Sequence, residues 1–238
     1  MKTVILAGGR GTRLAPYTTV FPKPMLPIDD KPILEIIIKQ LAYFGFKDIV
    51  LSVGYLAELI QAYFQNNHRL PKDVNVTYIR EGEPLGTAGS LSLVPDLTET
   101  FLVMNGDVLT TLDYSKLMGF HKKNKGIVTI AMHKRQVKID FGVISTNGKD
   151  ELTDYDEKPT LDYSVSMGVY VFEPKALAYV APGKKLDFPD LIKVLLAKGE
   201  KVCGYSNSDY WLDIGRHDDY EEAVKSFKSM ERLFLKQS

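Results

Sequence analysis

Cysteine is almost absent from this sequence of 238 residues, in which Cys203 stands alone. A single cysteine excludes a disulfide within the chain and fits a reducing compartment. Net charge is also missing, because 30 basic side chains balance 30 acidic ones. The composition therefore favours neither nucleic acid nor a membrane surface as a partner.

Long hydrophobic runs are missing as well. No apolar stretch approaches the roughly 20 residues that span a bilayer. Near the start, the apolar residues 4–7 are followed at once by glycines and arginines, so no signal peptide is expected. We therefore expect a cytoplasmic protein. No repeat, low-complexity tract or linker divides the chain, which predicts one domain over residues 1–238.

Strand-like and helix-like segments alternate through the first half of the chain. Apolar strand patterns are interleaved with helical ones, as in the strand 3–8, the helix 33–46 and the strand 48–55. This alternation predicts an α/β fold of the Rossmann-like, three-layer type, with a mostly parallel mixed central sheet. A further helix is expected at residues 85–94, just after a strand at 75–81.

The second half has a different pattern. Segments 141–146, 151–158 and 165–174 are strand-like with little helix between them. We expect them to add antiparallel strands around a sugar-sized cleft. Helices are predicted at 188–200 and, rich in charge, at 217–236.

A glycine-rich loop follows the first predicted strand. Gly8, Gly9 and Gly11 allow positive φ and close approach of the backbone to a ligand. Successive N–H groups of such a loop can cradle a phosphate. Arg13 adds a planar fork for phosphate oxygens and Lys23 adds a point charge. The loop is therefore predicted to bind phosphate at the carboxyl end of the sheet.

Two common phosphate-binding motifs do not fit this loop. The P-loop requires a lysine and a serine or threonine directly after its last glycine, and no lysine follows Gly11. The dinucleotide fingerprint requires a third glycine where this chain has Leu14.

The complete set of motifs resembles the sugar-1-phosphate nucleotidyltransferases, also called nucleoside-diphosphate-sugar pyrophosphorylases. The motifs are LAGGRGTRLAPYT, FPKPMLPI, KPILE, EPLGTAG, NGD, EKP, SMGVYVFEP and WLDIG, and they occur in the family order over nearly the full chain. Small departures are Tyr17, where leucine is usual, and Ser166-Met167, where asparagine-alanine is commoner. The resemblance implies the nucleotide-diphospho-sugar transferase type of fold.

The resemblance also implies a reaction. A sugar 1-phosphate oxygen attacks the α-phosphorus of a nucleoside triphosphate in line, giving a nucleoside-diphosphate sugar and pyrophosphate. Arg13 and Lys23 are the implied catalytic residues: Arg13 holds the β- and γ-phosphates, and Lys23 neutralises charge at the α-phosphate. Asp107 and Asp213 are implied ligands of Mg²⁺, which prefers carboxylate and phosphate oxygens.

Two further groups of binding residues follow from the matched motifs. The residues implied for the nucleotide are Leu6, Ala7, Gly8, Gly9, Gly11, Thr12, Arg13, Glu81, Pro84, Leu85, Gly86, Thr87, Asn105 and Gly106. The helix start at Thr87 is expected to offer free N–H donors to the base. The residues implied for the sugar phosphate are Gly142, Glu157, Lys158 and Ser166.

Two motifs give conflicting indications of which base and which sugar the protein uses. EPLGTAG looks most like the guanylyltransferase branch, which makes GDP-mannose or GDP-heptose, whereas SMGVYVF is similar to the glucose-1-phosphate adenylyltransferases. We expect GTP as the nucleotide, with UTP, dTTP, CTP or ATP as alternatives. A non-catalytic nucleotide-sugar-binding paralogue is the non-enzyme alternative. The expected partners are therefore a nucleoside triphosphate and a sugar 1-phosphate, without nucleic acid or membrane, and a homo-oligomer is possible.

Overall fold

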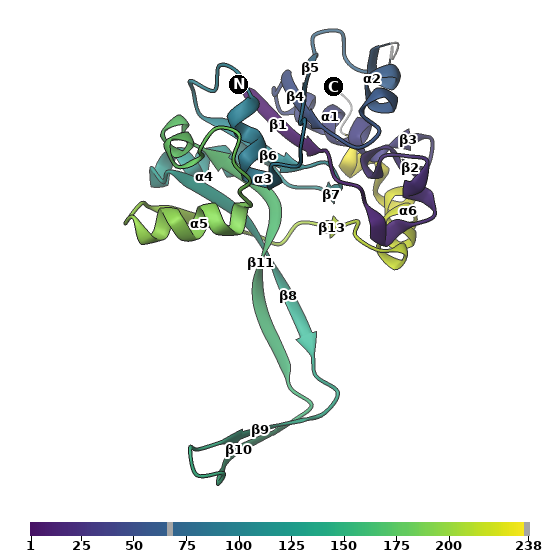
Figure 1. The fold of residues 1–238 in the computed structure, drawn as a ribbon. Helices are drawn as coiled ribbons and strands as arrows, with labels where there is room; N and C mark the ends of the chain where they lie inside the picture. Colours follow the sequence, from purple (N-terminus) through teal and green to yellow (C-terminus); the bar gives the residue numbers. More distant parts are fainter. Residues whose placement is uncertain (66–68, 236–238) are drawn as a thin grey trace.

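The computed structural model describes residues 1–65 and 69–235, and its centre is a seven-stranded sheet (Figure 1). The strand order is β12-β8-β11-β6-β1-β4-β5. Neighbours pair in parallel except β11, which is antiparallel to both β6 and β8. The predicted mostly parallel mixed sheet is thus confirmed. The strands are β1 (Lys2–Ala7), β4 (Asp48–Val53), β5 (Asn75–Arg80), β6 (Phe101–Asn105), β8 (Val128–Lys138), β11 (Thr160–Phe172) and β12 (Val202–Asn207).

Helices cover both faces of the sheet and produce the three layers expected from the sequence. Successive strand residues point to opposite faces, so Val4 and Ile5 of β1 enter two separate apolar cores. One core is closed by α1 (Ile33–Tyr43), α2 (Ala57–Gln65), α4 (Tyr114–Asn124) and α6 (His217–Phe234). The other is closed by α3 (Gly86–Gly89), α5 (Phe188–Ala197) and the 3₁₀ segments Ser90–Leu93 and Pro174–Tyr179.

Four predicted helices differ from the observed ones in extent. Those expected at 33–46 and 188–200 end at Tyr43 and Ala197. The helix expected at 85–94 is a single α-turn, α3, that continues as the 3₁₀ segment Ser90–Leu93. The charged C-terminal helix ends at Phe234, and Lys236 of its predicted range lies outside the described residues. No helix in the described part of the chain is both long and apolar enough to cross a membrane.

A long hairpin arm leaves the body of the protein. β8 and β11 stay paired from Met132 with Ser166 out to Lys138 with Thr160, and a second hairpin of β9 (Gly142–Thr146) and β10 (Leu152–Glu157) forms the tip. Figure 1 shows this arm projecting away from the sheet and its helices. The strands are antiparallel as expected, but β9 and β10 do not line the hollow of about 290 Å³ that the body of the chain forms.

Candidate nucleotide-binding site

A hollow of about 290 Å³ opens at the carboxyl ends of β1 and β6, where open α/β sheets bind ligands. It brings together most of the residues that the sequence nominates for the nucleotide, together with Lys23 and Asp107. The nominated nucleotide residues in its wall are Leu6, Ala7, Gly8, Gly9, Glu81, Pro84, Gly86, Thr87 and Asn105. Pro24, Ser90 and Asp187 also line it and were not predicted.

The glycine loop contains one position, Gly11, that only glycine can occupy without strain. Gly11 has φ +62°, and a Cβ placed there would lie 2.9 Å from Lys23 Cβ and 3.0 Å from Thr18 Cγ2. The Thr18 hydroxyl donates to the Gly11 carbonyl at 2.8 Å. Gly11 therefore lets the loop close onto Lys23, behind the wall of the hollow.

Lys23 and Asp107 form an ion pair at the floor of the site. The Lys23 ammonium donates to Asp107 Oδ2 at 2.5 Å, and Lys23 is only 8% exposed. The lysine comes from the 3₁₀ segment Lys23–Met25, whereas Asp107 lies in the turn between β6 and β7 (Val108–Thr110). The second carboxylate oxygen of Asp107, Oδ1, is buried with no hydrogen-bond partner among the described residues.

Asp213 is brought beside Asp107 by strand pairing. β13 (Trp211–Asp213) is antiparallel to β7, and the N–H of Ile214 donates to the Asp107 carbonyl at 3.1 Å. Part of Asp213 is exposed, yet its carboxylate has lost surrounding water and faces that of Asp107, and both effects raise its pKa. The positive charges of Lys23 and Arg13 oppose that rise. Both implied catalytic cations therefore act electrostatically on the same carboxylate.

This arrangement fits a magnesium ion held partly by substrate. Asp107 supplies an unpartnered buried oxygen and Asp213 a neighbouring one, and hard carboxylate oxygens suit Mg²⁺. Within residues 1–65 and 69–235, no group of three or more His, Cys, Asp or Glu side chains could enclose a metal. Two carboxylates plus phosphate oxygens is a common way to bind Mg²⁺, which dehydrates reluctantly.

Glu81 ties three parts of the site together. Its Oε1 accepts from the Ser52 hydroxyl at 3.0 Å, and its Oε2 accepts from the Leu85 N–H at 2.9 Å. The same Oε1 lies 3.3 Å from where a Cβ on Gly8 would stand. Glu81 therefore holds the loop 82–86 against β4 and the glycine loop.

The other end of this loop is fixed by the start of α5. Asp187 Oδ1 accepts from the Thr87 N–H at 3.0 Å, and the Leu186 carbonyl accepts from the N–H groups of Ala88 and Gly89 at 3.0 and 2.9 Å. The expectation of free N–H donors at the Thr87 helix start is therefore wrong for these three groups. They build the loop, and a base must be read by other groups in the wall.

Replacing Glu81 should loosen the loop without touching the charged cluster. Glu81→Ala is expected to raise the KM for the nucleoside triphosphate by about tenfold, because the hydrogen bonds that join Ser52 of β4 and the Leu85 N–H of the loop through Glu81 are lost, each of about 1 kcal/mol. Steady-state kinetics would measure this. Glu83→Ala, at an exposed position two residues away, is the matched control and should leave KM unchanged. An equal effect of both variants would contradict this role of Glu81.

Some nominated residues lie beside the hollow rather than in its wall. Arg13 and Thr12 are exposed on the 3₁₀ segment Thr12–Leu14, and Leu85 is half-buried next to Gly86. Gly106 is buried, and its N–H donates to the Leu6 carbonyl at 2.9 Å, so it packs the turn after β6 onto β1.

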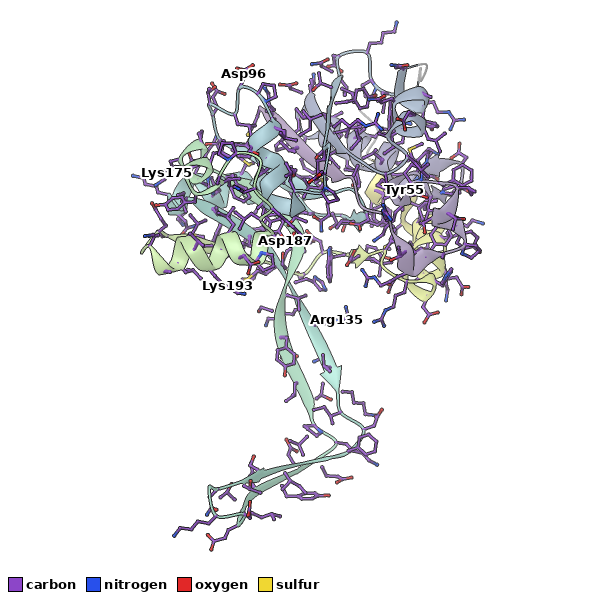
Figure 2. The ribbon with its side chains drawn as sticks, viewed as in Figure 1. Tyr55, Asp96, Arg135, Lys175, Asp187 and Lys193 are labelled. Atoms are coloured by element: carbon purple, nitrogen blue, oxygen red, sulfur yellow. The ribbon has the colours of Figure 1, made fainter. Side chains whose placement is uncertain are left out.

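The four residues nominated for the sugar phosphate are spread along the arm. Ser166 lies at the arm's root, where Gly168 packs so closely on Asn105 that an added Cβ would be 2.6 Å from Asn105 Nδ2. Gly142, Glu157 and Lys158 lie at the junction of the arm's stem and tip, beyond Arg135, which is labelled on the stem in Figure 2. Asp187, by contrast, lies at the body in the same view. Within one chain, these three residues are not brought to the hollow.

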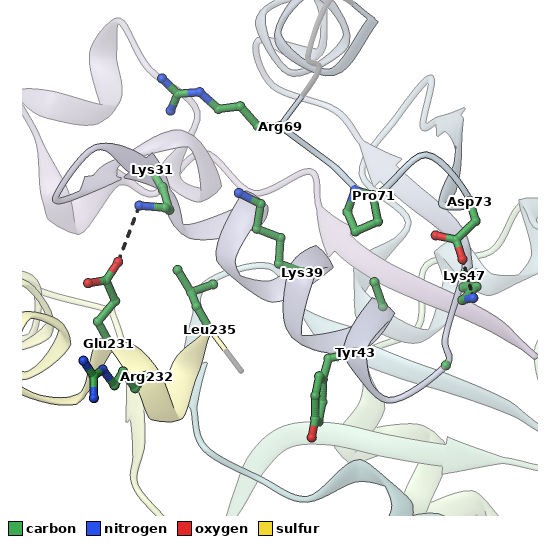
Figure 3. Close-up of a pocket in the computed structure, with 12 residues that line it drawn as sticks. Lys31, Lys39, Tyr43, Lys47, Arg69, Pro71, Asp73, Glu231, Arg232 and Leu235 are labelled. Atoms are coloured by element: carbon green, nitrogen blue, oxygen red, sulfur yellow. Dashed lines mark ion pairs between the residues drawn. The ribbon is translucent and has the colours of Figure 1, made fainter. Parts of the chain in front are cut away.

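A larger hollow of about 880 Å³ lies elsewhere, between α1 and the end of α6 (Figure 3). It is lined by several basic side chains. Most of them are neutralised within the protein: Lys31 pairs with Glu231 at 3.7 Å, Lys39 with Glu35 at 2.7 Å, and Lys47 with Asp73. None of the residues nominated from the sequence lines it, so its size alone does not make it the better candidate.

The fold and this site define an α/β protein with a glycine-rich loop and two carboxylates at the carboxyl edge of a mostly parallel sheet. Residues 2–229 match the nucleotidyl transferase family. The chain therefore belongs to that family.

Relatives match along nearly the whole chain. It is 33% identical to a UTP–glucose-1-phosphate uridylyltransferase of Synechocystis, over 97% of this chain and 64% of that protein. It is 31% identical to the D-glycero-α-D-manno-heptose 1-phosphate guanylyltransferase of Aneurinibacillus thermoaerophilus, over 96% of this chain and 99% of that protein. The chain thus spans less than two thirds of the first relative and nearly all of the second.

A solved structure shows the same fold. HddC from Yersinia pseudotuberculosis, crystallised with GMP-PN, superposes with a TM-score of 0.71 at 27% identity, covering 95% of this chain and 99% of that one.

Proposed function

We propose that this protein transfers a nucleoside monophosphate from a nucleoside triphosphate to a sugar 1-phosphate, releasing pyrophosphate in a Mg²⁺-assisted reaction. The observation that carries the proposal is the Lys23–Asp107 ion pair in the wall of the hollow, with the Asp213 carboxylate beside Asp107. Membership of the nucleotidyl transferase family supports it. The opposed charges, the phosphate loop and the orphaned Asp107 oxygen all suit a triphosphate with its metal.

The chain's own residues position the reactants and balance their charge. The glycine loop receives the triphosphate with its N–H groups, and Arg13 holds the β- and γ-phosphates that leave as pyrophosphate. Lys23, already fixed by Asp107, faces the charge that grows at the α-phosphate. The sugar phosphate oxygen is an anion already, so no general base is needed and orientation is the main requirement. Bound Mg²⁺ would add charge neutralisation between Asp107, Asp213 and the phosphates.

GTP is the nucleotide we favour, with mannose or heptose 1-phosphate as the acceptor. The heptose guanylyltransferase relative matches this chain end to end, and HddC was crystallised with a guanine nucleotide analogue. The uridylyltransferase relative keeps UTP as the main alternative, followed by dTTP, CTP and ATP, and a non-catalytic nucleotide-sugar-binding protein is the other. We place the reaction in the cytoplasm.

A panel of triphosphates against sugar 1-phosphates tests this assignment. We expect pyrophosphate release with GTP and a sugar 1-phosphate, and the highest kcat/KM for GTP, because a wrong base leaves buried polar groups of the wall unpaired. Competition between triphosphates, with products resolved by mass, is the measurement. If the main product is a pyrimidine nucleotide sugar, the assignment of GTP as the substrate is wrong. If the protein binds a nucleotide sugar but releases no pyrophosphate, the non-catalytic alternative is favoured.

A further inference from the structure

The arm carries the residues that the nucleotide hollow lacks. Glu157 and Lys158, nominated for the sugar phosphate, lie at the junction of the arm's stem and tip. The hollow in the body is walled by the phosphate loop, the 81–87 loop and Asn105. Its wall includes none of Gly142, Glu157 and Lys158. The body of one chain therefore presents the triphosphate half of a site.

The stem is too long and too regular for these residues to return to their own body. Between Ser166 and Thr160 each residue of β11 pairs with one of β8, so the stem extends about 20 Å at about 3.3 Å per residue. The junction is itself ordered, since the N–H of Ile139 donates to the Pro159 carbonyl at 3.0 Å and Pro159 is buried. A hinge at the junction would move the tip but leave Glu157 and Lys158 at the end of the stem.

The arm also presents an apolar surface that a lone chain leaves in water. Eight of the eighteen large apolar side chains exposed within the described residues lie between 137 and 163, which marks the arm as the surface most in need of a cover. Phe141 at the junction is 78% exposed, and Leu152 and Tyr155 of the tip are 65% and 57% exposed.

A matching surface lies beside the phosphate loop of this same chain. Val20 and Phe21 are 61% and 53% exposed there, next to the segment that carries Lys23. The charges are complementary as well: residues 140–158 hold six acidic and two basic side chains, whereas Arg10, Arg13 and Arg216 are exposed around the loop. Apolar contact with a rim of opposite charges is the usual composition of a specific interface.

We propose that two copies of this chain exchange their arms, and that Glu157 and Lys158 of each arm complete the sugar-phosphate half of the other copy's active site. Such a reciprocal exchange uses the same surfaces twice and closes as a two-fold dimer. The proposal rests on the proposed function for what the completed site does. The exchange of arms itself rests on the geometry of the stem and on the exposed apolar side chains.

Mixed dimers of two inactive variants test the exchange directly. One chain carries Asp107→Asn in the body, and the other carries Glu157→Ala with Lys158→Ala on the arm. In a mixed dimer with exchanged arms, one of the two sites combines an intact body with an intact arm. Mixed dimers purified through two different tags are therefore expected to show about half the wild-type activity per dimer, although each variant alone is inactive.

A matched pair controls for unspecific rescue. Asp107→Asn mixed with Lys23→Ala puts a defect in both bodies, so neither site of that dimer is intact and no activity should return. An inactive mixture of the body and arm variants, alongside an active wild type, would overturn the proposal, because it would place the arm in its own chain's site. Normal turnover by the Glu157→Ala, Lys158→Ala chain would overturn it too.

A measurement of the protein's mass in solution tests the exchange of arms independently of the proposed function. Wild type should sediment as a dimer, at twice the 26.8 kDa of one chain, and Phe141→Ser with Ile144→Ser should shift it towards monomer. If the wild type lacks transferase activity with every substrate pair yet shows this shift, the proposed function fails and the exchange of arms is supported. A wild type that is monomeric at micromolar concentration overturns the exchange whether or not it is active.

Discussion

Asp107→Asn and Asp213→Asn are each expected to lower kcat on the order of 100-fold or more, because each removes a charged oxygen from the two-carboxylate site, and stabilisation by a metal ion is worth several kcal/mol. Initial rates at saturating Mg²⁺ and both substrates measure this. Asp209→Asn, at an exposed position near Asp213 in sequence, is the matched control and should keep normal turnover. Near-normal kcat for either active-site variant would remove that residue from the metal site.

The same two substitutions should act in opposite directions on stability. The pKa of Asp213 is raised above its ordinary value of 3.8 by loss of water and by Asp107, so its ionised form destabilises the folded state once the pH exceeds that raised pKa. Asp213→Asn removes the charge and should raise Tm at neutral pH. The gain should shrink as the pH falls through the raised pKa, since protonation then removes the charge in the wild type as well.

Asp107→Asn should instead lower Tm. The substitution leaves the buried Lys23 ammonium without its carboxylate partner, which costs about 1–3 kcal/mol. Thermal melts of both variants between neutral and acidic pH distinguish the two effects. A loss of Tm in both variants would show that Asp213 is stabilised by Lys23 and Arg13 more than it is destabilised by Asp107.

That Gly8 and Asp107 share one hollow was predictable from the sequence because both residues follow strands. Asp107 follows β6 and Gly8 follows β1, and parallel strands deliver the residues after their carboxyl ends to one edge. Asp187 was missed because it reaches the hollow from the start of α5, a hundred residues away from its partner Thr87. No local pattern around Asp187 encodes that contact.

The course of the arm could not be read from the sequence for a different reason. Antiparallel strands were expected at 141–146, 151–158 and 165–174, and β9, β10 and β11 are observed there as antiparallel strands. The same alternation suits a strand on the body and a strand that runs out beyond it, because pairing fixes the register and not the path of the hairpin. The position of Glu157 and Lys158 relative to the hollow therefore needed the structure.

Lys23→Ala and Arg13→Ala are expected to fail in different ways. Lys23 is buried and aligned by Asp107, so its loss should lower kcat by about 100-fold or more while the KM for the triphosphate changes little. Arg13 is exposed beside Gly215 and would hold the β- and γ-phosphates, so its loss should raise KM and lower kcat together.

Arg10→Ala is the matched control for both variants. Arg10 lies on the same loop, but its guanidinium stands 6.0 Å from the centre of the Tyr55 ring, and it does not line the hollow. Rates over a range of triphosphate concentrations, and calorimetric titration of the triphosphate without sugar phosphate, separate binding from turnover. Lys23→Ala should bind the triphosphate nearly as wild type does, whereas Arg13→Ala should bind it more weakly. A Lys23→Ala variant with normal kcat and a raised KM would place Lys23 on the leaving phosphates instead of the α-phosphate.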